Sequence, residues 1–341
     1  MAFTTINNGS DYFNTKLYTG NGSTQSITGV GFQPDWTWIK NRTSAEGHAI
    51  FDVVRGVTKM LSSANSDAET TTANSLTAFG SDGFSVGSNL RVNQSSNNIV
   101  SWNWKANGAG SANTDGSINS TVSVNQTAGF SISTFTTLSS TISTVGHGLG
   151  VIPDMVIVKT RANSNGWFVY HKDVGNNKFL RLETTGAETT NAMWNDTTPT
   201  SSVFSINANN LGASTSVAYC FAEKQGYSKF GSYVGNGNAD GTFIYTGFKP
   251  AFIIVKRTNN GSDWQLMDNK RDPINAMDTN LFPNTNDVDT SSSSYDTDFL
   301  SNGFKFRGTS GARNGSGDTY IYMAFAEAPL VGTNDIPANA R

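Results

Sequence analysis

A long unit that occurs three times is the feature that most constrains how this chain of 341 residues can fold. Three related stretches, PDWTWIK, VIPDMVIVK and KPAFIIVK, mark corresponding places in units that run over residues 17–105, 129–223 and 230–327. The units agree in the order, spacing and type of their residues. At about 100 residues each they are much longer than solenoid repeats, so each is expected to have its own hydrophobic core.

The composition of the units predicts strands rather than helices. The chain contains 34 Gly and only 14% charged residues, and Ser, Thr and Asn recur between short apolar runs. Such a pattern is typical of short strands joined by polar turns. We therefore expect an all-β chain of three tandem antiparallel β-sandwiches, jelly-roll-like in class.

The segments outside the three units are short and polar. Residues 1–16 are expected to form an N-terminal segment and residues 328–341 a C-terminal tail. Residues 106–128 have the small polar composition of a linker. Only about six residues separate the second and third units, which favours rigid docking of those two.

The repeat also tells which role the paired tryptophans have. Trp36 and Trp38 could be a sugar-stacking platform or plain core, but Met155 and Ile157 stand at their places in the second unit. Apolar character is kept while the flat aromatic face is not, which favours core packing. Trp102 and Trp104 follow the same rule, and Pro34, Pro153 and Pro250 are each expected to precede an equivalent buried strand.

Candidates for catalysis are few. The histidines His48, His147 and His171 match no zinc-binding spacing, and the single Cys220 lies in the middle of an expected strand, where a buried inert thiol is typical. No carboxylate pair has the apolar surroundings that a glycosidase acid requires. We therefore expect no catalytic, cofactor-binding or metal-binding residue and no enzyme activity.

Three other patterns have simple interpretations. The acidic run with Asp287, Asp289, Asp296 and Asp298 could ligate Ca²⁺, but it lacks the glycine and closing Glu of a twelve-residue calcium loop, so a solvated loop is the alternative. Asp52 with Arg55, and Asp268 with Arg271, recur at matching places and indicate a local ion pair or an interface contact, which at a surface would contribute little. GNGNADG (235–241) lacks phosphate-loop spacing and is expected to be a hairpin turn.

Charge and hydropathy exclude two classes of partner. The net charge of −3 provides no broad cationic surface, so nucleic acid is not an expected partner. The N-terminus lacks a secretory signal and no window is apolar enough to span a membrane, which predicts synthesis in a cytosol without membrane insertion. The single cysteine leaves stability to packing and to oligomerisation.

Several long phrases resemble a repeat of virion proteins from tailed bacteriophages, especially marine and cyanobacterial phages. They include YTGNG, GFQPDWTWIK, SWNWKA, GHGLGVIPDMVIVK, YCFAEKQGYSKFGSYVGNG and YIYMAFAE, and the resemblance covers nearly the whole chain. Proteins of this kind are described as tail-fibre-like or simply as structural. The resemblance supplies no catalytic residues to carry over.

The resemblance implies a non-enzymatic virion structural protein, made in the host cytoplasm and exposed on the particle. It would be a tail-fibre or receptor-binding component, or a capsid-mounted fibre, that contacts other virion proteins and host surface glycans. A capsid decoration or cement protein without a ligand is the alternative, and a polysaccharide-degrading enzyme is a third. The resemblance also implies a homo-oligomer, with a trimer preferred because phage fibres and spikes are commonly trimeric.

Overall fold

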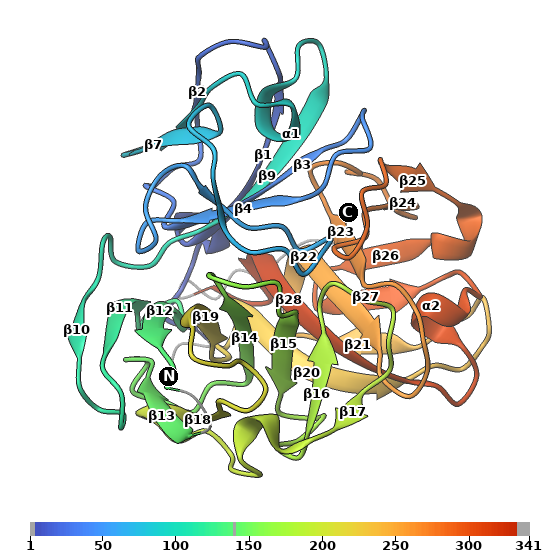
Figure 1. Ribbon diagram of the computed structural model, residues 1–341. Coiled ribbons are helices and arrows are strands. Elements are labelled where there is room, and N and C mark those ends of the chain that lie inside the picture. Colours follow the sequence, from blue (N-terminus) through green and yellow to red (C-terminus); the bar gives the residue numbers. More distant parts are fainter. Residues whose placement is uncertain (1–3, 139–140, 333–341) are drawn as a thin grey trace.

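The computed structural model describes residues 4–138 and 141–332 and shows three lobes arranged around a common centre (Figure 1). The lobes follow the repeat, with the first unit at the top of the view, the second at the lower left and the third at the lower right. Strands dominate, and all paired strands in the described ranges are antiparallel except for one isolated parallel bridge. The predicted all-β class of tandem antiparallel sandwiches is confirmed.

The first unit consists of a main sheet that faces a smaller one. The main sheet has the order β1-β9-β3-β4, and the smaller sheet has the order β2-β8-β7. The main strands are β1 (Phe13–Thr19), β9 (Asn98–Trp104), β3 (Trp36–Asn41) and β4 (Ala49–Asp52). The smaller sheet contains β2 (Gln25–Thr28), β8 (Gly83–Val86) and β7 (Leu76–Gly80), and a ribbon of β5 (Lys59–Met60) with β6 (Thr70–Thr71) and the short helix α1 (Leu90–Asn93) complete the unit.

The third unit repeats this arrangement. Its main sheet has the order β20-β28-β22-β23, made of β20 (Ser228–Val234), β28 (Thr319–Pro329), β22 (Phe248–Arg257) and β23 (Gln265–Asp268). Its smaller sheet has the order β21-β27-β26, made of β21 (Phe243–Tyr245), β27 (Gly303–Phe306) and β26 (Thr297–Leu300). The ribbon is β24 (Thr279–Asn280) with β25 (Thr290–Ser291), and the short helix is α2 (Gly311–Asn314).

The second unit has the same central strands in a wider sheet. The order β12-β19-β14-β15 corresponds to the other main sheets and is made of β12 (Phe130–Thr136), β19 (Thr215–Phe221), β14 (Met155–Thr160) and β15 (Trp167–His171). On one edge β16 (Lys178–Arg181) and β17 (Thr189–Thr190) extend it, and on the other edge β10 (Ser111–Asn113) and β11 (Ser120–Asn125) do so. The smaller sheet is the pair β13 (Ile142–Gly146) and β18 (Val203–Asn207).

The main strands are buried on both faces. In β3 and β14 every residue is buried, and alternate side chains point in opposite directions. One face of each main sheet packs against its own smaller sheet, which gives each unit a sandwich core. The other face of all three sheets points to the centre of the molecule, where one apolar cluster joins the units.

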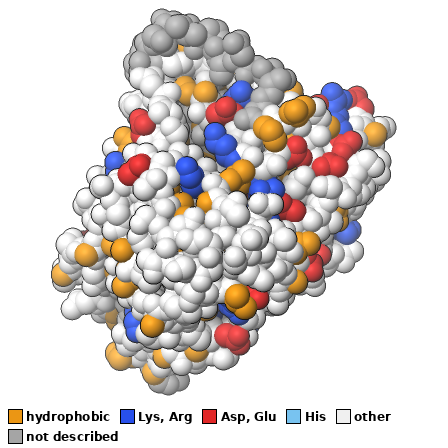
Figure 2. Space-filling model, turned by 90° about the horizontal axis from the view of Figure 1, so that it is seen from above, with side chains coloured by type: hydrophobic (Ala, Val, Ile, Leu, Met, Phe, Trp, Pro, Cys, Tyr) orange, Lys and Arg blue, Asp and Glu red, His pale blue; other side chains and the backbone are white. Residues whose placement is uncertain are grey.

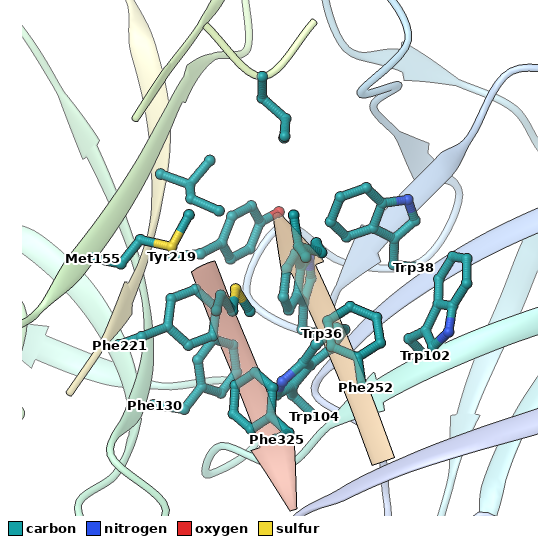
Figure 3. Packing of buried hydrophobic residues seen from close by; sticks show 14 of the residues in the cluster. Trp36, Trp38, Trp102, Trp104, Phe130, Met155, Tyr219, Phe221, Phe252 and Phe325 are labelled. Carbon is teal, nitrogen blue, oxygen red and sulfur yellow. The ribbon is translucent and has the colours of Figure 1, made fainter. Parts of the chain in front are cut away.

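Aromatic side chains dominate this shared core (Figure 3). Trp36 packs against Trp104 of its own unit and against Tyr219 of the second unit, with ring centroids 4.3 and 4.6 Å apart. Phe252 and Phe325 bring the third unit into contact with Trp104. Trp36 and Trp38 are each 1% exposed, as the comparison between the repeats predicts, and their partners across the central strand keep one register: Trp36 opposite Trp104, Met155 opposite Phe221, and Phe252 opposite Phe325.

The predicted linker over residues 106–128 is wrong. This segment forms β10 and β11, and β11 pairs with β12 along six residues. Val122 and Ser123 are buried within it, so its Ser, Thr and Asn content belongs to a strand at the edge of the sheet. The polar composition concealed a short alternating segment, TVSV, that pairs with an existing sheet.

Two boundaries also differ from the sequence prediction. The first unit begins within the predicted N-terminal segment, because β1 starts at Phe13, and Ile6 already contributes to the shared core. Pro34 and Pro153 precede their buried strands, but Pro250 lies inside β22 at a shift of register. A proline is tolerated at such a bulge because a ladder hydrogen bond is already missing there.

Candidate functional site: the interfaces between the units

One structural position in each unit forms the same hydrogen bond to the neighbouring unit. Trp167 donates from Nε1 to the carbonyl oxygen of Ser62 in the first unit, at 2.8 Å, and Trp264 donates in the same way to Arg181 in the second unit. His48 occupies this position in the first unit, and its Nε2 lies 3.1 Å from the carbonyl oxygen of Phe282 in the third. The second unit therefore contacts the first, the third contacts the second, and the first contacts the third, which closes a ring.

A buried lysine strengthens each interface in the same cyclic order. The Nζ atoms of Lys40, Lys159 and Lys256 donate to backbone carbonyls of the neighbouring unit, those of Asn286, Ser66 and Thr185 respectively. Each also donates to carbonyls of its own unit. Burial lowers the pKa of all three ammonium groups to about 8, and the ring of carbonyl acceptors suits the charged form at neutral pH.

The Asp–Arg pairs that the sequence shows in the first and third units lie at two of these interfaces. Asp52 pairs with Arg55, and the Oδ2 of Asp52 also accepts a hydrogen bond from the hydroxyl of Tyr219 in the second unit, at 2.8 Å. Asp268 pairs with Arg271 at 2.5 Å and accepts from Trp102 Nε1 in the first unit, at 3.0 Å. All four charged side chains are fully buried. Of the two alternatives given from the sequence, the structure therefore shows interface contacts, and the small contribution expected of a surface ion pair does not apply to them.

A second carboxylate extends each pair across the interface. Glu69 accepts from Arg55 at 2.9 Å and from Arg161 of the second unit at 2.8 Å. Burial alone would raise the pKa of Glu69, but hydrogen bonds from Arg161 and the charge of Arg55 outweigh it and lower the pKa. Asp289 takes the same position between Arg271 and Arg42 of the first unit. Two interfaces therefore contain an alternating chain of two acids and two arginines.

The interface between the second and third units departs from this pattern. His171 stands where the others have Asp52 and Asp268, and Val174 stands where they have arginine. Thr258 replaces the crossing arginine of the other two interfaces. Glu188, which corresponds to Glu69, instead pairs within its own unit with Lys178 at 2.5 Å.

A groove of about 470 Å³ runs along this third interface. Its floor continues the inner face of the sheet of the third unit, and its lining residues include Ser232, Val234, Thr319, Val174, Lys178 and Glu188. A polar depression of about 530 Å³ lies on the second unit beside Arg161, and a pocket of about 180 Å³ lies next to Phe13. The linings of these depressions mix polar and apolar side chains, and none of the three brings together the residues considered for catalysis from sequence.

The three histidines and the cysteine have structural surroundings. His48 Nδ1 accepts from Trp38 Nε1 at 2.7 Å, and burial lowers the pKa of His48 well below its usual value. Burial likewise lowers the pKa of His147, and it lowers that of His171 to about 4. Cys220 is buried in the sandwich core of the second unit, which raises the pKa of its thiol. These groups are neutral and enclosed by protein at neutral pH.

The acidic run is divided among separate partners. Asp289 belongs to the interface chain of charges, and Asp298 pairs with Arg307 at 2.6 Å. Within residues 4–138 and 141–332, no three His, Cys, Asp or Glu side chains come together in a group that could hold a metal ion. No helix in the described part of the chain is long and apolar enough to cross a membrane.

The repeated phrases YTGNG and YVGNG form loops that a buried asparagine holds in place. Asn93, at the end of α1, accepts from the backbone N–H of Asn21 at 2.8 Å, and Asn314, at the end of α2, accepts from the N–H of Asn236 at 3.1 Å. GNGNADG connects β20 of the main sheet to β21 of the smaller sheet. These two strands do not pair with each other, so the predicted hairpin turn is wrong. The near identity of these phrases reflects loop geometry.

Sequence reasoning missed the cyclic set of contacts, although part of the signal was visible. A lysine occupies the same place near the end of the buried strand in all three units, as Lys40, Lys159 and Lys256. A lysine retained beside an apolar run indicates a specific acceptor. The direction of the contacts could not be inferred from sequence. It depends on how the units pack.

The comparison with known families covers all three units. No curated protein and no solved structure matches the chain. One family profile covers residues 8–329, which include all three units and all of the shared core except Ile6. The chain belongs to the family described as Domain of unknown function (DUF7483).

Proposed function

We propose that the chain is a non-enzymatic structural protein of a tailed bacteriophage particle, exposed on its surface as a tail-fibre or receptor-binding component or as a capsid-mounted fibre. The structural observation that supports a display role is the closed ring of three sandwiches around one aromatic core. Such a ring is a rigid support for surface loops. Loops on a rigid scaffold are a common way to present a binding surface.

The face of the molecule shown in Figure 2 suits an exposed position on a particle. In Figure 2 Lys and Arg side chains are interspersed with Asp and Glu, and hydrophobic side chains form small scattered groups. Long-range attraction to nucleic acid or to a charged membrane needs a surface dominated by one sign of charge. The mixed surface is better suited to short-range hydrogen bonding with a glycan or with another virion protein.

The phage assignment rests on the resemblance of the repeat to virion proteins. Its test is the composition of purified particles of the phage that encodes the chain. Quantitative mass spectrometry of these particles should find the protein in several copies, and gold-labelled antibodies should locate it. A tail position supports the receptor-binding role, hundreds of copies on the head favour the decoration role, and absence from purified particles would refute the proposal.

The non-enzymatic part has a separate test. Purified protein is incubated with envelope polysaccharide of the host, and new reducing ends are measured over time. We expect none above a buffer control. Fragments that accumulate with turnover would make the chain a polysaccharide-degrading enzyme.

The oligomeric state is the third element of the proposal. The shared core is closed within one chain, so a trimer of chains is not needed to bury it. A homotrimer, expected from the resemblance, would therefore form through outer surfaces of the lobes. Native mass spectrometry of the purified chain and of detergent-released particle components should find trimers, and a monomer in both would refute this element.

A further inference from the structure

Two aromatic rings are exposed side by side on the outer face of the third unit. Phe243 and Tyr245 lie two apart on β21 and are 42% and 51% exposed. Ile244 between them is 5% exposed and points into the sandwich core. Residues two apart on a strand share a face, so both rings lie on the solvent side of the smaller sheet. Trp36 and Trp38, by contrast, lie on a strand that is buried on both faces.

The neighbouring strand leaves room for the two rings. Tyr245 pairs with Gly303 across the sheet, and Phe243 pairs with Lys305. A Cβ atom at Gly303 would lie 2.0 Å from the carbonyl oxygen of Ile244 and 3.2 Å from Cε2 of Phe243. The Phe243 ring therefore approaches the backbone of Gly303, and the position opposite Tyr245 on β27 carries no side chain.

Paired charges line the same face next to the rings. Lys305 Nζ lies 2.5 Å from Oδ1 of Asp240, and Arg307 Nε lies 2.6 Å from Oδ2 of Asp298. Asp298 stands opposite Lys305 on the next strand. The ion pairs fix the positions of these groups while the Asp240 side chain remains 78% exposed. Each group keeps further donor or acceptor capacity for a ligand.

The repeat supplies an internal comparison. The inward pair of Ile244 with Phe304 in the third unit matches Ile27 with Phe84 in the first. By this register Ser26 and Thr28 stand where the third unit has Phe243 and Tyr245, and Ser85 stands where it has Lys305. In the second unit the corresponding residues are Thr144, Gly146 and Ser205. The first unit therefore forms its sandwich without aromatic or charged residues at these positions, whereas in the second unit residues 113–118 cover the corresponding face. The first unit indicates that the fold does not require the aromatic pair.

We propose that Phe243 and Tyr245 form a carbohydrate-binding platform for a neutral hexopyranose with equatorial hydroxyls. The C–H face of such a ring is apolar and flat and would stack on the two aromatic rings. Its rim hydroxyls can bond to the fixed Lys305, Arg307 and Asp240 groups, which suit a neutral ligand because their charges are already compensated. The inference rests on the proposed function, since it identifies where a surface-exposed virion protein binds a host glycan.

The test measures binding of the full chain to neutral oligosaccharides. Glucose hexamers in α and β linkage are used as probes, first by saturation-transfer NMR and then by calorimetry with the better probe. The double variant Phe243→Ser/Tyr245→Thr carries the residues of the first unit at these positions. We expect wild type to bind at least one probe, with saturation transferred from the protein to the C–H protons of the sugar, and the double variant to bind at least about tenfold more weakly.

Two controls distinguish loss of the platform from loss of the fold. The double variant should keep the wild-type unfolding curve, because both side chains are exposed, and Ser26→Ala/Thr28→Ala at the same positions of the first unit should not change affinity. Equal binding by wild type and the aromatic double variant would overturn the platform, and so would a wild type that binds no probe. Either result leaves the location of the protein on particles unaffected. If the double variant no longer formed an oligomer of chains but bound glycan as wild type does, the platform would also be overturned, and the two rings would instead be part of a contact between proteins.

Discussion

Two tryptophans on one strand provide a sharp test of the interface chemistry. Trp36 and Trp38 are equally buried and both face the shared core. Trp38 Nε1 donates to His48 Nδ1, whereas no described residue accepts a hydrogen bond from Trp36 Nε1. His48 is fully buried, and its Nε2 is engaged with the carbonyl oxygen of Phe282. A phenylalanine at position 38 therefore leaves a buried acceptor without its donor, while a phenylalanine at position 36 does not.

The expected magnitudes follow from this difference. Replacing either indole by a phenyl ring leaves a small cavity that costs about 1 kcal/mol. The orphaned His48 Nδ1 adds about 1–3 kcal/mol at position 38 only. Trp36→Phe should thus lower the free energy of unfolding by about 1 kcal/mol and Trp38→Phe by roughly 2–4 kcal/mol. Trp38→Ala removes the whole ring and should cost at least about 3–5 kcal/mol.

The assay is equilibrium unfolding in urea, followed by far-ultraviolet circular dichroism, with wild type and both phenylalanine variants in parallel. The third unit has Phe252 at the position of Trp36, which makes Trp36→Phe a matched control that the fold already accepts in another repeat. Equal losses in the two variants, or a larger loss at position 36, would refute the reasoning from the hydrogen bond.

The remaining predictions concern the ring and its charges. Arg55→Met leaves Asp52 buried beside the second unit without its counter-charge and should cost about 3–5 kcal/mol in urea unfolding, whereas Lys178→Met, at the interface without the charge chain, should cost less than about 1 kcal/mol. Because burial lowers the pKa of His171 to about 4, the stability that neutral His171 contributes is present above about pH 6.5 and is lost as the pH falls toward 4. His171→Gln should therefore flatten this part of a plot of unfolding free energy against pH, and an unchanged slope would contradict the prediction. Because burial lowers the pKa of Lys40, Lys159 and Lys256 to about 8, the unfolded chain binds more protons than the folded chain between about pH 8 and 10.5, and the unfolding free energy should rise over this range. A fall of the unfolding free energy across about pH 8–9.5 would show that the fold favours the ammonium form. A fragment of residues 129–223 exposes Met155, Ile157 and Tyr219 of the shared core and should aggregate or self-associate in ultracentrifugation, and a stable monomer would show that the units fold independently.

Much of the fold could be predicted from the sequence because its signals are local or repeated. Glycine and polar turns between short apolar runs predict antiparallel strands, and three copies of one pattern give the number of units. Substitution between copies was informative about single residues as well. Met155 at the position of Trp36 shows that only apolar bulk is required there, and both residues are in the shared core. The prediction that the chain has no zinc site and no catalytic nucleophile used only the order and spacing of its residues.

The position of residues relative to a neighbouring unit could not be predicted in this way. Asp52 and Asp268 are charged, and a local interpretation places such residues at a surface, yet they are buried because a partner unit supplies Tyr219 and Trp102 as donors. The segment 106–128 is polar enough for a linker, but the open edge of β12 provides hydrogen-bond partners that make it a strand. Phe243 and Tyr245 show the reverse case, since their apolar pattern resembles a core strand and only the register of β21 against β27 places both rings in solvent. Periodicity along the chain determined which residues alternate between two faces. Which of those faces meets water, and which meets another unit, depended on long-range packing that no local pattern contains.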